Sequence, residues 1–484
     1  MVSTSPTVGR ATLRVVFALM TDHGWVPRSV DVRTAFLQGL PLDRVKPVYV
    51  RPPPQAHVPD GLLWELRKCA YGLTDAPRRW YEAVVALLLS LGYVRCEVDH
   101  GLFFLFVGGR LLFVIATHVD DFLYGGAATE VKRFETALRK SFDVGPVTVG
   151  TLTFTGLRVV TDADPSSGSL TIKVDQDHYL ATIDAVPVSA ARLSTNAAAV
   201  SSVELTQYRR AVGALLWASG QTQPYLACAS SLLARRFHQA VVKDLVDVNR
   251  SIGAAQAACG LPLLYQHVGA PYRLVLFTDA SSITLQSATA QTGYLLFLSK
   301  DGARGALHPD TALTLLAWGS HRQRRVTHSS FAAETYALLD GMRAAIETAC
   351  VLAHLTDGTD ASLLPVDAFT DCHGLFNTMS GTGLSRPKEI NAAIAALRDM
   401  YSSAAMSSLT WLPAAGQVAD CLTKPSSSAS LRAVLRSGRY GLRPVGALTK
   451  THETDRTDLD AALLPSSVDE AASSASPPRL SMHC

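Results

Sequence analysis

The sequence predicts two successive units of the α/β and α+β fold classes, both of which combine helices with β-sheets. The chain has 484 residues, of which 48% are hydrophobic and 18% are charged, enough apolar material for several globular cores. Short apolar runs that suit buried strands end in acidic residues twice, near residue 120 and near residue 279. Stretches with helical periodicity separate these runs. We therefore expect chemistry at the acidic ends of the strands.

The composition excludes few partners. The formal net charge is +3, so any surface for nucleic acid has to be a local patch. Eight cysteines are scattered without a C-x-x-C pair, which is typical of buried thiols in a reducing compartment. The apolar stretch 102–117 is interrupted by Gly108 and Gly109 and is too short to predict a membrane helix. We expect a protein that does not enter the membrane.

The first 150 residues read as alternating helices and strands. Gly24 ends an amphipathic helix, Pro77 stands in the first turn of another helix, and the pair Gly108-Gly109 suits a hairpin turn. The expected elements in order are a helix over 10–24, strands over 29–37 and 47–51, a helix over 74–92, strands over 102–107 and 111–118, and a helix over 129–142.

The remaining elements follow the same reasoning. Residues 207–265 read as mostly helical, and a second α/β pattern begins near Tyr272. It comprises strand-like runs at 273–279, 293–298 and 313–320, a helix over 332–355, a strand that ends at Asp371, two helical stretches, a strand at 409–413 and a last helix around Asp420. The tail from about residue 447 is rich in Ser, Ala, Thr and Asp and is expected to be disordered.

The first carboxylate set consists of Asp31, Asp120 and Asp121. Two adjacent acids after an apolar strand repel each other unless a cation lies beside them, and a divalent metal removes that cost. Two strands of one sheet could bring Asp31 to the pair, as two-metal phosphoryl transfer requires. An Asp-Asp pair alone is more often a solvated turn, so the surrounding residues have to decide between these readings.

The second set consists of Asp279, Glu334, Asp371 and Asp420. These acids stand at the ends of strands and near the starts of helices, an arrangement that fits a two-metal α/β nuclease. Taken singly, each is more often a surface acid or a helix cap.

The surrounding motifs resemble copia-type retrotransposon Pol polyproteins. Residues 30–38 (VDVRTAFLQ) resemble the metal-binding strand of that family's reverse transcriptase, 65–81 (ELRKCAYGLTDAPRRWY) its Y-G-L-x-x-A-P-R-x-W-Y segment, and 117–126 (THVDDFLYGG) its Y-V-D-D hairpin. Residues 208–235 resemble the segment that follows the thumb. The run TDAS, AWGSHRQRRVTHSS, AAETYALL, TDCHG and VADCLTKP resembles the ribonuclease H domain at the end of these polyproteins.

The resemblance assigns roles residue by residue. Asp31, Asp120 and Asp121 would bind the polymerase metals, and Asp279, Glu334, Asp371 and Asp420 those of the ribonuclease. Phe36 would stack under the incoming sugar, although a core aromatic is an equal alternative. Gly72, Ala76, Pro77 and Arg78 would shape the nucleotide and template site, with a solvated helix face as the alternative for Arg78 and Arg79. Arg322, Arg324 and Arg325 could contact a hybrid backbone or stand in solvent.

Several positions depart from the family pattern. His118 replaces the usual Tyr before V-D-D, Asp75 stands where Gln is usual, and Glu389 replaces the His of a K-H-I segment. We also expect the fingers subdomain, with the basic residues that hold the triphosphate, to be absent.

The resemblance predicts four segments. These are a reverse-transcriptase palm with truncated fingers at 1–150, a mostly helical palm end with thumb and connection at 151–270, a ribonuclease H-like domain at 271–430, and a disordered tail at 447–484.

It also implies an activity: RNA-directed DNA polymerase and hybrid ribonuclease with two Mg²⁺ (or Mn²⁺) per site. The partners would be an RNA template, a DNA primer, an RNA·DNA hybrid and deoxynucleoside triphosphates, in cytoplasmic particles that later reach the nucleus. The alternatives are a chain with ribonuclease H activity alone and a decayed remnant that at most binds nucleic acid.

Overall fold

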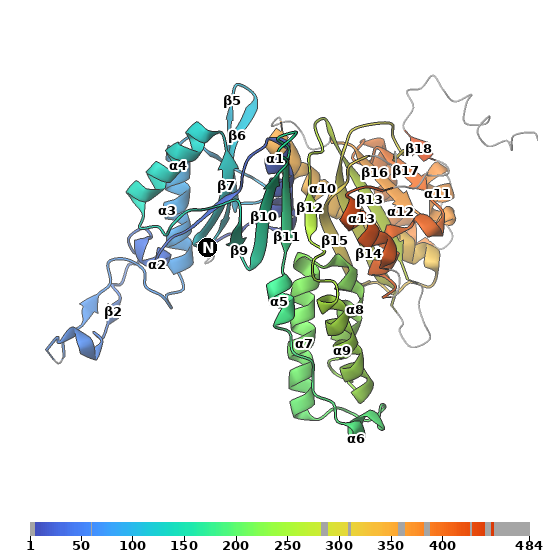
Figure 1. Cartoon of the computed structure of the whole chain (residues 1–484), viewed down its shortest axis with the longest axis horizontal. Helices are drawn as coiled ribbons and strands as arrows, with labels where there is room; N and C mark the ends of the chain where they lie inside the picture. The colour runs from blue at the N-terminus through green and yellow to red at the C-terminus, as the bar shows by residue number, and fades with distance from the viewer. Residues whose placement is uncertain are drawn as a thin grey trace, which may run out of the picture. The chain divides into compact units, whose positions relative to one another are not determined.

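The computed structural model describes residues 5–59, 61–281, 289–307, 311–356, 364–381, 388–425, 428–440 and 447–449. Residues Met1–Leu448 form one compact unit, which Figure 1 shows with its element labels. Most of the segment predicted to be a disordered tail, residues 450–484, lies outside the described residues. Among the described residues, no helix has both the length and the apolar character that crossing a membrane requires.

The first sheet has six strands in the order β4-β5-β6-β7-β1-β8. Its neighbouring strands are antiparallel, and alternate side chains point to opposite faces. The helices α3 (Ala76–Ser90) and α4 (Ala128–Ser141) cover one face, and α1 (Arg10–Asp22) packs on the other. The strands are β1 (Arg28–Asp31), β4 (Val94–Arg95), β5 (Leu102–Val107), β6 (Arg110–His118), β7 (Asp121–Gly126) and β8 (Thr148–Val149).

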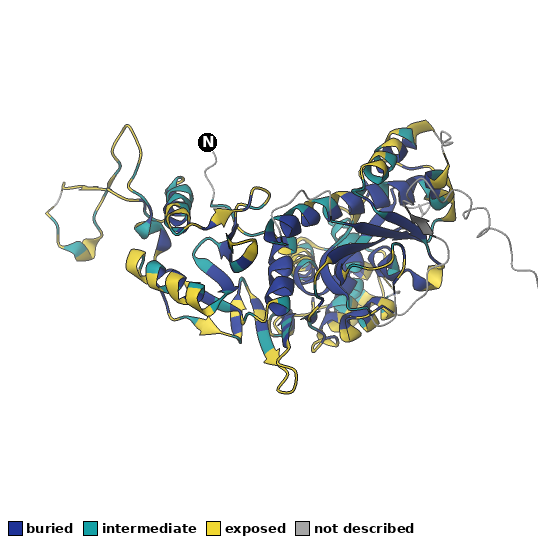
Figure 2. Cartoon of the chain, turned by 90° about the horizontal axis from the view of Figure 1, so that it is seen from above, coloured by how far each residue is buried: buried dark blue, intermediate teal, exposed yellow. Residues whose placement is uncertain are grey.

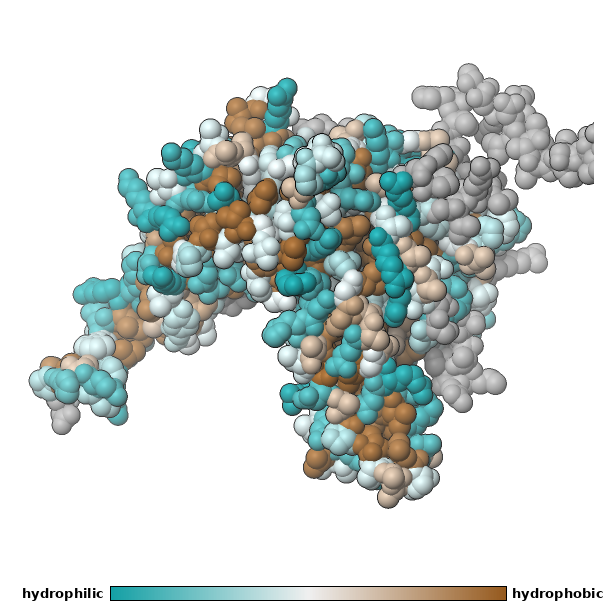
Figure 3. Space-filling view, viewed as in Figure 1, coloured by the Kyte–Doolittle hydropathy of each residue, from teal (hydrophilic) through white to brown (hydrophobic). Residues whose placement is uncertain are grey.

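A separate arm lies between α2 (Ala35–Gln38) and α3. It contains the two-stranded sheet of β2 (Tyr49–Val50) and β3 (Trp64–Glu65) and the short helix η1 (Pro54–Ala56). Large apolar side chains are exposed on it, among them Tyr49, Leu62 and Trp64. Figure 3 shows hydrophobic atoms among hydrophilic ones on this arm, at the lower left.

The second sheet and a group of helices form the middle of the chain. The sheet has the order β12-β11-β10-β9, with β9 (Leu152–Phe154), β10 (Leu157–Ala163), β11 (Leu170–Asp175) and β12 (Leu263–Tyr265). The helices are α5 (Asp177–Ala181), α6 (Ala190–Leu193), α7 (Ser202–Gln221), η2 (Pro224–Leu226), α8 (Ala227–Ala234) and α9 (Val242–Gln256). The long helix α7 begins with a capping box between Ser201 and Glu204.

The third sheet has the order β15-β14-β13-β16-β17-β18. Strands β13 (Tyr272–Ala280), β14 (Gln291–Lys300) and β15 (Thr314–Arg322) are antiparallel, whereas β16 (Val366–Thr370) and β17 (Ser408–Trp411) run parallel to β13. The helix α10 (Ser330–Thr356) packs on β13 and β14. The other elements are α11 (His373–Ser380), η4 (Lys388–Ile390), α12 (Asn391–Ser402), η5 (Ala414–Gly416), η6 (Val418–Leu422), α13 (Ala429–Ser437) and β18 (Ala447–Thr449).

Helix α1 lies inside a core that all three sheets share. Every residue from Thr12 to Thr21 is buried. One hydrophobic cluster joins α1 to the first and second sheets, to α7–α9 and to the third sheet. Figure 2, coloured by burial, shows buried residues in the interior elements and exposed residues on the outer helices and loops. The predicted amphipathic helix is therefore present, and later segments of the chain cover its polar side as well.

The structure confirms the predicted mixture of helix and sheet and corrects two local predictions. Residues 29–37 do not form one strand: β1 ends at Asp31, Thr34 has a φ of 47°, and Phe36 lies in the short helix α2. Residues 151–270 contain the second sheet in addition to the predicted helices. The alternation of apolar and polar residues over 152–175 was a strand signal for this sheet.

Candidate active sites

The first carboxylate set lies where β1 meets the β6–β7 hairpin. Asp31 of β1 is the register partner of Asp121 of β7, and the amide of Val32 donates to the carbonyl of Asp120 over 3.0 Å. Because His118 pairs with Asp121, the hairpin turn consists of Val119 and Asp120 alone. The predicted tight turn and the predicted meeting of two strands are both present at the level of the backbone.

The surroundings of Asp31 and Asp121 favour the neutral forms of these two acids. Partial burial, followed by the charges of Asp120 and Asp31, raises the pKa of Asp121 to about 6. Desolvation and then Asp120 also raise the pKa of Asp31, although Arg33 opposes them. Asp31 is exposed, and the three residues are not among the described groups whose ligand atoms lie within 4.8 Å of one another.

The hairpin turn is held by Trp80 of α3. The indole Nε1 donates to the carbonyl of Val119 over 2.6 Å, and the Trp80 side chain is completely buried. Val119 has a φ of 59°, a left-handed conformation that is rare for a β-branched residue. Trp80 lies in the segment 65–81, and the resemblance to the family motif assigned it no role. The structure shows that it fixes the backbone next to the two acids.

The other residues predicted for this site lie on α2, α3 and the loop between them. The ring of Phe36 lies 5.1 Å from that of Tyr71, Gly72 has a φ of +94°, and Ala76 is buried at the start of α3, followed by Pro77. The guanidinium of Arg78 is paired with Glu82 at 3.1 Å. That pairing agrees with a helix-surface role, and a contact with phosphate stays a prediction.

The second carboxylate set brings three strand and helix residues together. Asp279 lies in β13, Glu334 near the start of α10, and Asp371 directly after β16. One ligand atom from each lies within 4.8 Å of the others. Asp279 and Glu334 are only 2% and 6% exposed. Strands β13 and β16 are parallel neighbours, so their carboxyl ends meet at one edge of the sheet.

Burial of these acids shapes their chemistry. Desolvation raises the pKa of Asp279 to about 6, although a hydrogen bond from the Thr423 hydroxyl opposes it. Desolvation, followed by the charges of Asp279 and Asp371, raises the pKa of Glu334 well above its ordinary value. The Glu334 carboxylate accepts the amide of Ala280 on Oε1 at 3.1 Å, whereas its buried Oε2 has no hydrogen-bond partner within the described part of the chain.

The fourth predicted ligand, Asp420, is not part of this trio, although its charge contributes to raising the pKa values of Asp279 and Asp371. It lies in η6, and its carboxylate accepts the ammonium of Lys424 at 2.9 Å. Lys424 also acts electrostatically on Asp279 and Asp371. Thr423, which directly precedes Lys424, donates its hydroxyl to the carboxylate of Asp279. Thr423 and Lys424 belong to the run VADCLTKP, in which only Asp420 was predicted to have a role.

The buried trio suits a divalent cation. All three ligands are carboxylates, the hard oxygen donors that Mg²⁺ and Mn²⁺ prefer, and the unpartnered Oε2 of Glu334 needs a cation or a donor. Three carboxylates that are mostly buried also repel one another unless protons or a metal compensate their charge.

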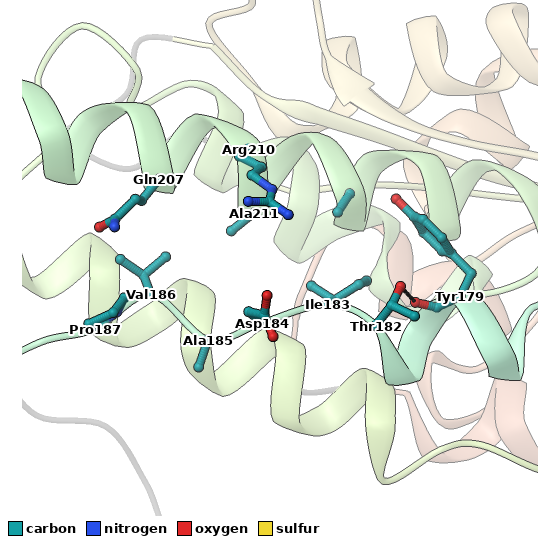
Figure 4. A pocket seen from close by; sticks show the side chains of 11 residues that line it. Tyr179, Thr182, Ile183, Asp184, Ala185, Val186, Pro187, Gln207, Arg210 and Ala211 are labelled. Carbon is teal, nitrogen blue, oxygen red and sulfur yellow. Dashed lines mark hydrogen bonds between the residues drawn. The ribbon is translucent and has the colours of Figure 1, made fainter.

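One cavity lies away from both carboxylate sets. It has a volume of about 620 Å³ and lies between α7 and the segment that follows α5 (Figure 4). Arg210 and Asp184 line it on opposite sides, but no acid of either set does. Size alone therefore does not mark the chemistry of this chain.

Comparison with known proteins agrees with this picture. The profile of the family described as "Reverse transcriptase (RNA-dependent DNA polymerase)" matches residues 2–195. The chain is 27% identical over 436 residues to the retrovirus-related Pol polyprotein from transposon RE2 of Arabidopsis thaliana, and 26% identical over 440 residues to that from transposon RE1. Each alignment covers 87% of this chain. Residues 2–195 thus match the reverse transcriptase family, and most of the chain is similar to retrotransposon Pol polyproteins.

Other similar proteins cover smaller parts of the chain or of their own length. A putative transposon Ty5-1 protein of Saccharomyces cerevisiae is 27% identical over 281 residues, which cover 54% of this chain and 87% of the yeast protein. The chain spans 28% of the length of the two Arabidopsis polyproteins. A solved foamy viral protease-reverse transcriptase in complex with RNA/DNA hybrid aligns over 82% of this chain and 45% of its own, with 10% identity and a TM-score of 0.44. This last likeness is too distant to carry an argument about this chain.

Proposed function

We propose that this chain is an RNA-directed DNA polymerase and a ribonuclease of RNA·DNA hybrids of the copia type, with a two-metal site for each activity. Its partners are an RNA template, a DNA primer, their hybrid and deoxynucleoside triphosphates. The observation that carries the proposal is the buried trio of Asp279, Glu334 and Asp371, whose ligand atoms lie within 4.8 Å of one another.

At the ribonuclease site, Asp279, Glu334, Asp371 and Asp420 hold the cations. Bound Mg²⁺ supplies Lewis acidity for attack of water on a phosphodiester. The chain itself supplies the fixed geometry: Thr423 orients Asp279, the amide of Ala280 orients Glu334, and Lys424 holds Asp420. The burial of Asp279 and Glu334 keeps bulk water from their carboxylates, which strengthens electrostatic interactions there.

At the polymerase site, Asp31, Asp120 and Asp121 hold the cations. The register of β1 against β7 and the bond from Trp80 to Val119 support this role, because they fix the backbone of the acids without any ligand. His118 stands where the resembled family has Tyr. It lies at the end of β6, where its register partner is Asp121 of β7.

The test uses the purified chain with Mg²⁺, a labelled RNA·DNA hybrid and a primer–template with all four nucleotides. We expect Asp371→Asn to abolish cleavage and to leave primer extension largely intact. The matched variant Asp120→Asn should abolish extension and leave cleavage intact. Cleavage that survives Asp371→Asn would refute the assignment of the ribonuclease site. Extension that survives Asp120→Asn would refute the assignment of the polymerase site.

A chain with ribonuclease activity alone is the second candidate. One observation favours it: the ribonuclease trio is clustered and mostly buried, whereas Asp31 is exposed and the polymerase acids are not clustered to the same degree. The same two assays separate the candidates, since a chain that cuts hybrids under conditions in which it extends no primer supports this second function.

A further inference from the structure

A series of hydrogen bonds links helix α8 to the segment that holds Asp279. It begins at the end of α8, where the hydroxyl of Ser231 and the guanidinium of Arg235 both bond the side chain of Gln291 in β14. Gln291 is only 2% exposed. Because α8 belongs to the middle of the chain and β14 to the third sheet, these bonds join two parts of the fold.

The side-chain amide of Gln291 uses both of its donors. Its Nε2 donates to the hydroxyl of Ser231 over 3.0 Å and to the hydroxyl of Ser320 over 2.7 Å, and its Oε1 accepts from Arg235. Ser320, in turn, has a single hydroxyl hydrogen and donates it to the carbonyl of Leu422 over 2.5 Å. The donors and acceptors therefore follow one direction, from Gln291 through Ser320 to Leu422.

The last link reaches a member of the ribonuclease trio. The residue after Leu422 is Thr423, whose hydroxyl donates to the carboxylate of Asp279. Gly293, the register partner of Asp279 in β14, lets this segment approach closely: a Cβ atom added there would lie 2.7 Å from Cβ of Leu422 and 3.0 Å from Cγ2 of Thr423. The segment thus lies directly on the backbone of β14, and Ser320 bonds it from the neighbouring strand β15.

The cation at the α8 end of the network is held at a cost. The Nε of Arg235 is buried and has no hydrogen-bond partner within the described part of the chain. Burial, followed by the charge of Arg322, lowers the pKa of Arg235. A buried polar atom without a partner reduces stability, so a neutral side chain would suit this place better if only stability counted. A role in holding Gln291 accounts for the arginine.

We propose that Gln291 and Ser320 are positioning residues of the ribonuclease site, and that they couple the binding of a divalent cation there to the seating of helix α8. The inference rests on the proposed ribonuclease function and adds a route by which the middle of the chain acts on the trio. Groups that bond a metal ligand from behind orient it and set how tightly it holds the metal. Because the coupling is one free energy shared by the two events, each event favours the other.

Manganese binding in the absence of nucleic acid tests the coupling. The full chain is titrated with Mn²⁺, free Mn²⁺ is measured by electron paramagnetic resonance, and the share of binding that Asp371→Asn removes is assigned to the trio. We expect Ser320→Ala to weaken this share about tenfold, and the double variant Ser231→Ala with Arg235→Ala to weaken it several-fold. Ser320→Thr, which keeps the hydroxyl, should restore the affinity. The matched control Ser299→Ala removes another hydroxyl that is bonded to a carbonyl in the third sheet, and should change nothing.

The reverse effect gives a second measurement. Addition of Mn²⁺ to the parent chain should slow amide hydrogen exchange in residues 227–235, and should not do so in Ser320→Ala or Asp371→Asn. In cleavage assays, Ser320→Ala should raise the Mg²⁺ concentration that gives half of the maximal rate and leave the maximal rate nearly unchanged. A loss of cleavage at every Mg²⁺ concentration, together with a loss of primer extension, would mean a general folding defect and would overturn the proposal.

The outcomes separate this proposal from the proposed function. If Asp371→Asn removes no Mn²⁺ binding, the trio holds no cation and the proposed ribonuclease function itself fails. If Asp371→Asn removes binding but Ser320→Ala leaves it unchanged, that function stands and the positioning role of Gln291 and Ser320 is wrong. If Ser320→Ala weakens binding but the double variant on α8 does not, the coupling to α8 is wrong.

Discussion

The guanidinium of Arg14 lies 3.7 Å from the ring centroid of Trp318. This cation–π contact links helix α1 to strand β15 of the third sheet. The same guanidinium donates to the carbonyl of Leu316 in β15 and to the carbonyls of Gly220 and Gln221 at the end of α7. Burial lowers its pKa to about 10, so it stays charged at neutral pH. One side chain thus joins three parts of the chain.

We expect Arg14→Ala to lower the free energy of unfolding by about 3 kcal/mol, because two buried carbonyls and one partly buried carbonyl lose their donor. Urea denaturation measures the change. The control is Arg10→Ala, which removes an exposed arginine from the same helix and should cost less than about 0.5 kcal/mol. Equal effects of the two variants would show that the buried bonds of Arg14 contribute nothing.

The opposite end of α1 is bonded to the segment that leads into β13. The carboxylate of Asp22 accepts the amides of Val268 at 2.6 Å and Gly269 at 3.0 Å, and the hydroxyl of Tyr272 at 2.7 Å. Because the core is continuous as well, we expect one cooperative transition on heating. The double variant with Arg14→Ala and Asp22→Ala should split it into two, as seen by calorimetry. Two transitions in the unaltered chain would contradict this and would favour separate packing of the segments before and after residue 271.

The left-handed conformation of Val119 predicts an unusual response to glycine. A β-branched residue at a φ of 59° carries strain of about 1 kcal/mol or more, which glycine relieves. Val119→Gly should therefore cost less stability than Val107→Gly, which changes an exposed valine at the end of strand β5. Chemical denaturation of both variants gives the comparison. A larger loss for Val119→Gly would mean that its side-chain packing outweighs the strain.

The raised pKa of Asp279 predicts how stability depends on pH in the absence of metal. Its pKa is about 6 in the folded chain, against about 3.9 in an unfolded one, so between these values the folded chain binds more protons. Stability is lost as pH rises through this window. Asp279→Asn removes this titration. Between pH 4 and pH 7.5, the free energy of unfolding of the variant should therefore rise by on the order of 2–3 kcal/mol relative to that of the parent chain. Urea denaturation of both chains in EDTA, at both pH values, measures this change. A difference in stability between variant and parent that is the same at the two pH values would show that the pKa of Asp279 is not raised.

The two sites also differ in preorganisation, which predicts their relative rates. The clustered trio at the ribonuclease site needs little rearrangement to bind cations, whereas Asp31 is exposed and less constrained. We expect the chain to cleave a hybrid better than it extends a primer, by orders of magnitude, since positioning contributes several kcal/mol of barrier. Parallel assays at the same Mg²⁺ concentration measure both rates. A chain that extends primers efficiently but leaves the hybrid uncut would show that the polymerase site, not the ribonuclease site, is the better organised of the two.

Apolar runs predicted the strands well because burial selects them directly. The runs 102–107 and 111–118 became β5 and β6, and the predicted helix over 332–355 became α10 at Ser330–Thr356. The acidic ends of β13 and β16 followed from the same runs, so the trio at the third sheet could be inferred before its geometry was known.

Other features depend on contacts between distant residues, which local patterns do not contain. Residues 29–37 read as one strand, but Thr34 turns the chain and places Phe36 in α2. Thr423 and Lys424 were missed because their roles depend on Asp279 and Asp420 lying beside them. The burial of α1 was missed because its polar side is covered by segments far along the chain.

The position of α1 has a consequence for synthesis. Its partners at Gly220, Tyr272 and Leu316 leave the ribosome hundreds of residues after it, so the helix cannot be covered until the third sheet is made. Such long-range contacts slow folding and leave apolar surface open to wrong pairing while the chain grows. A chain terminated within the third sheet would retain every acid of the first carboxylate set and yet expose the helix on which its own sheet packs.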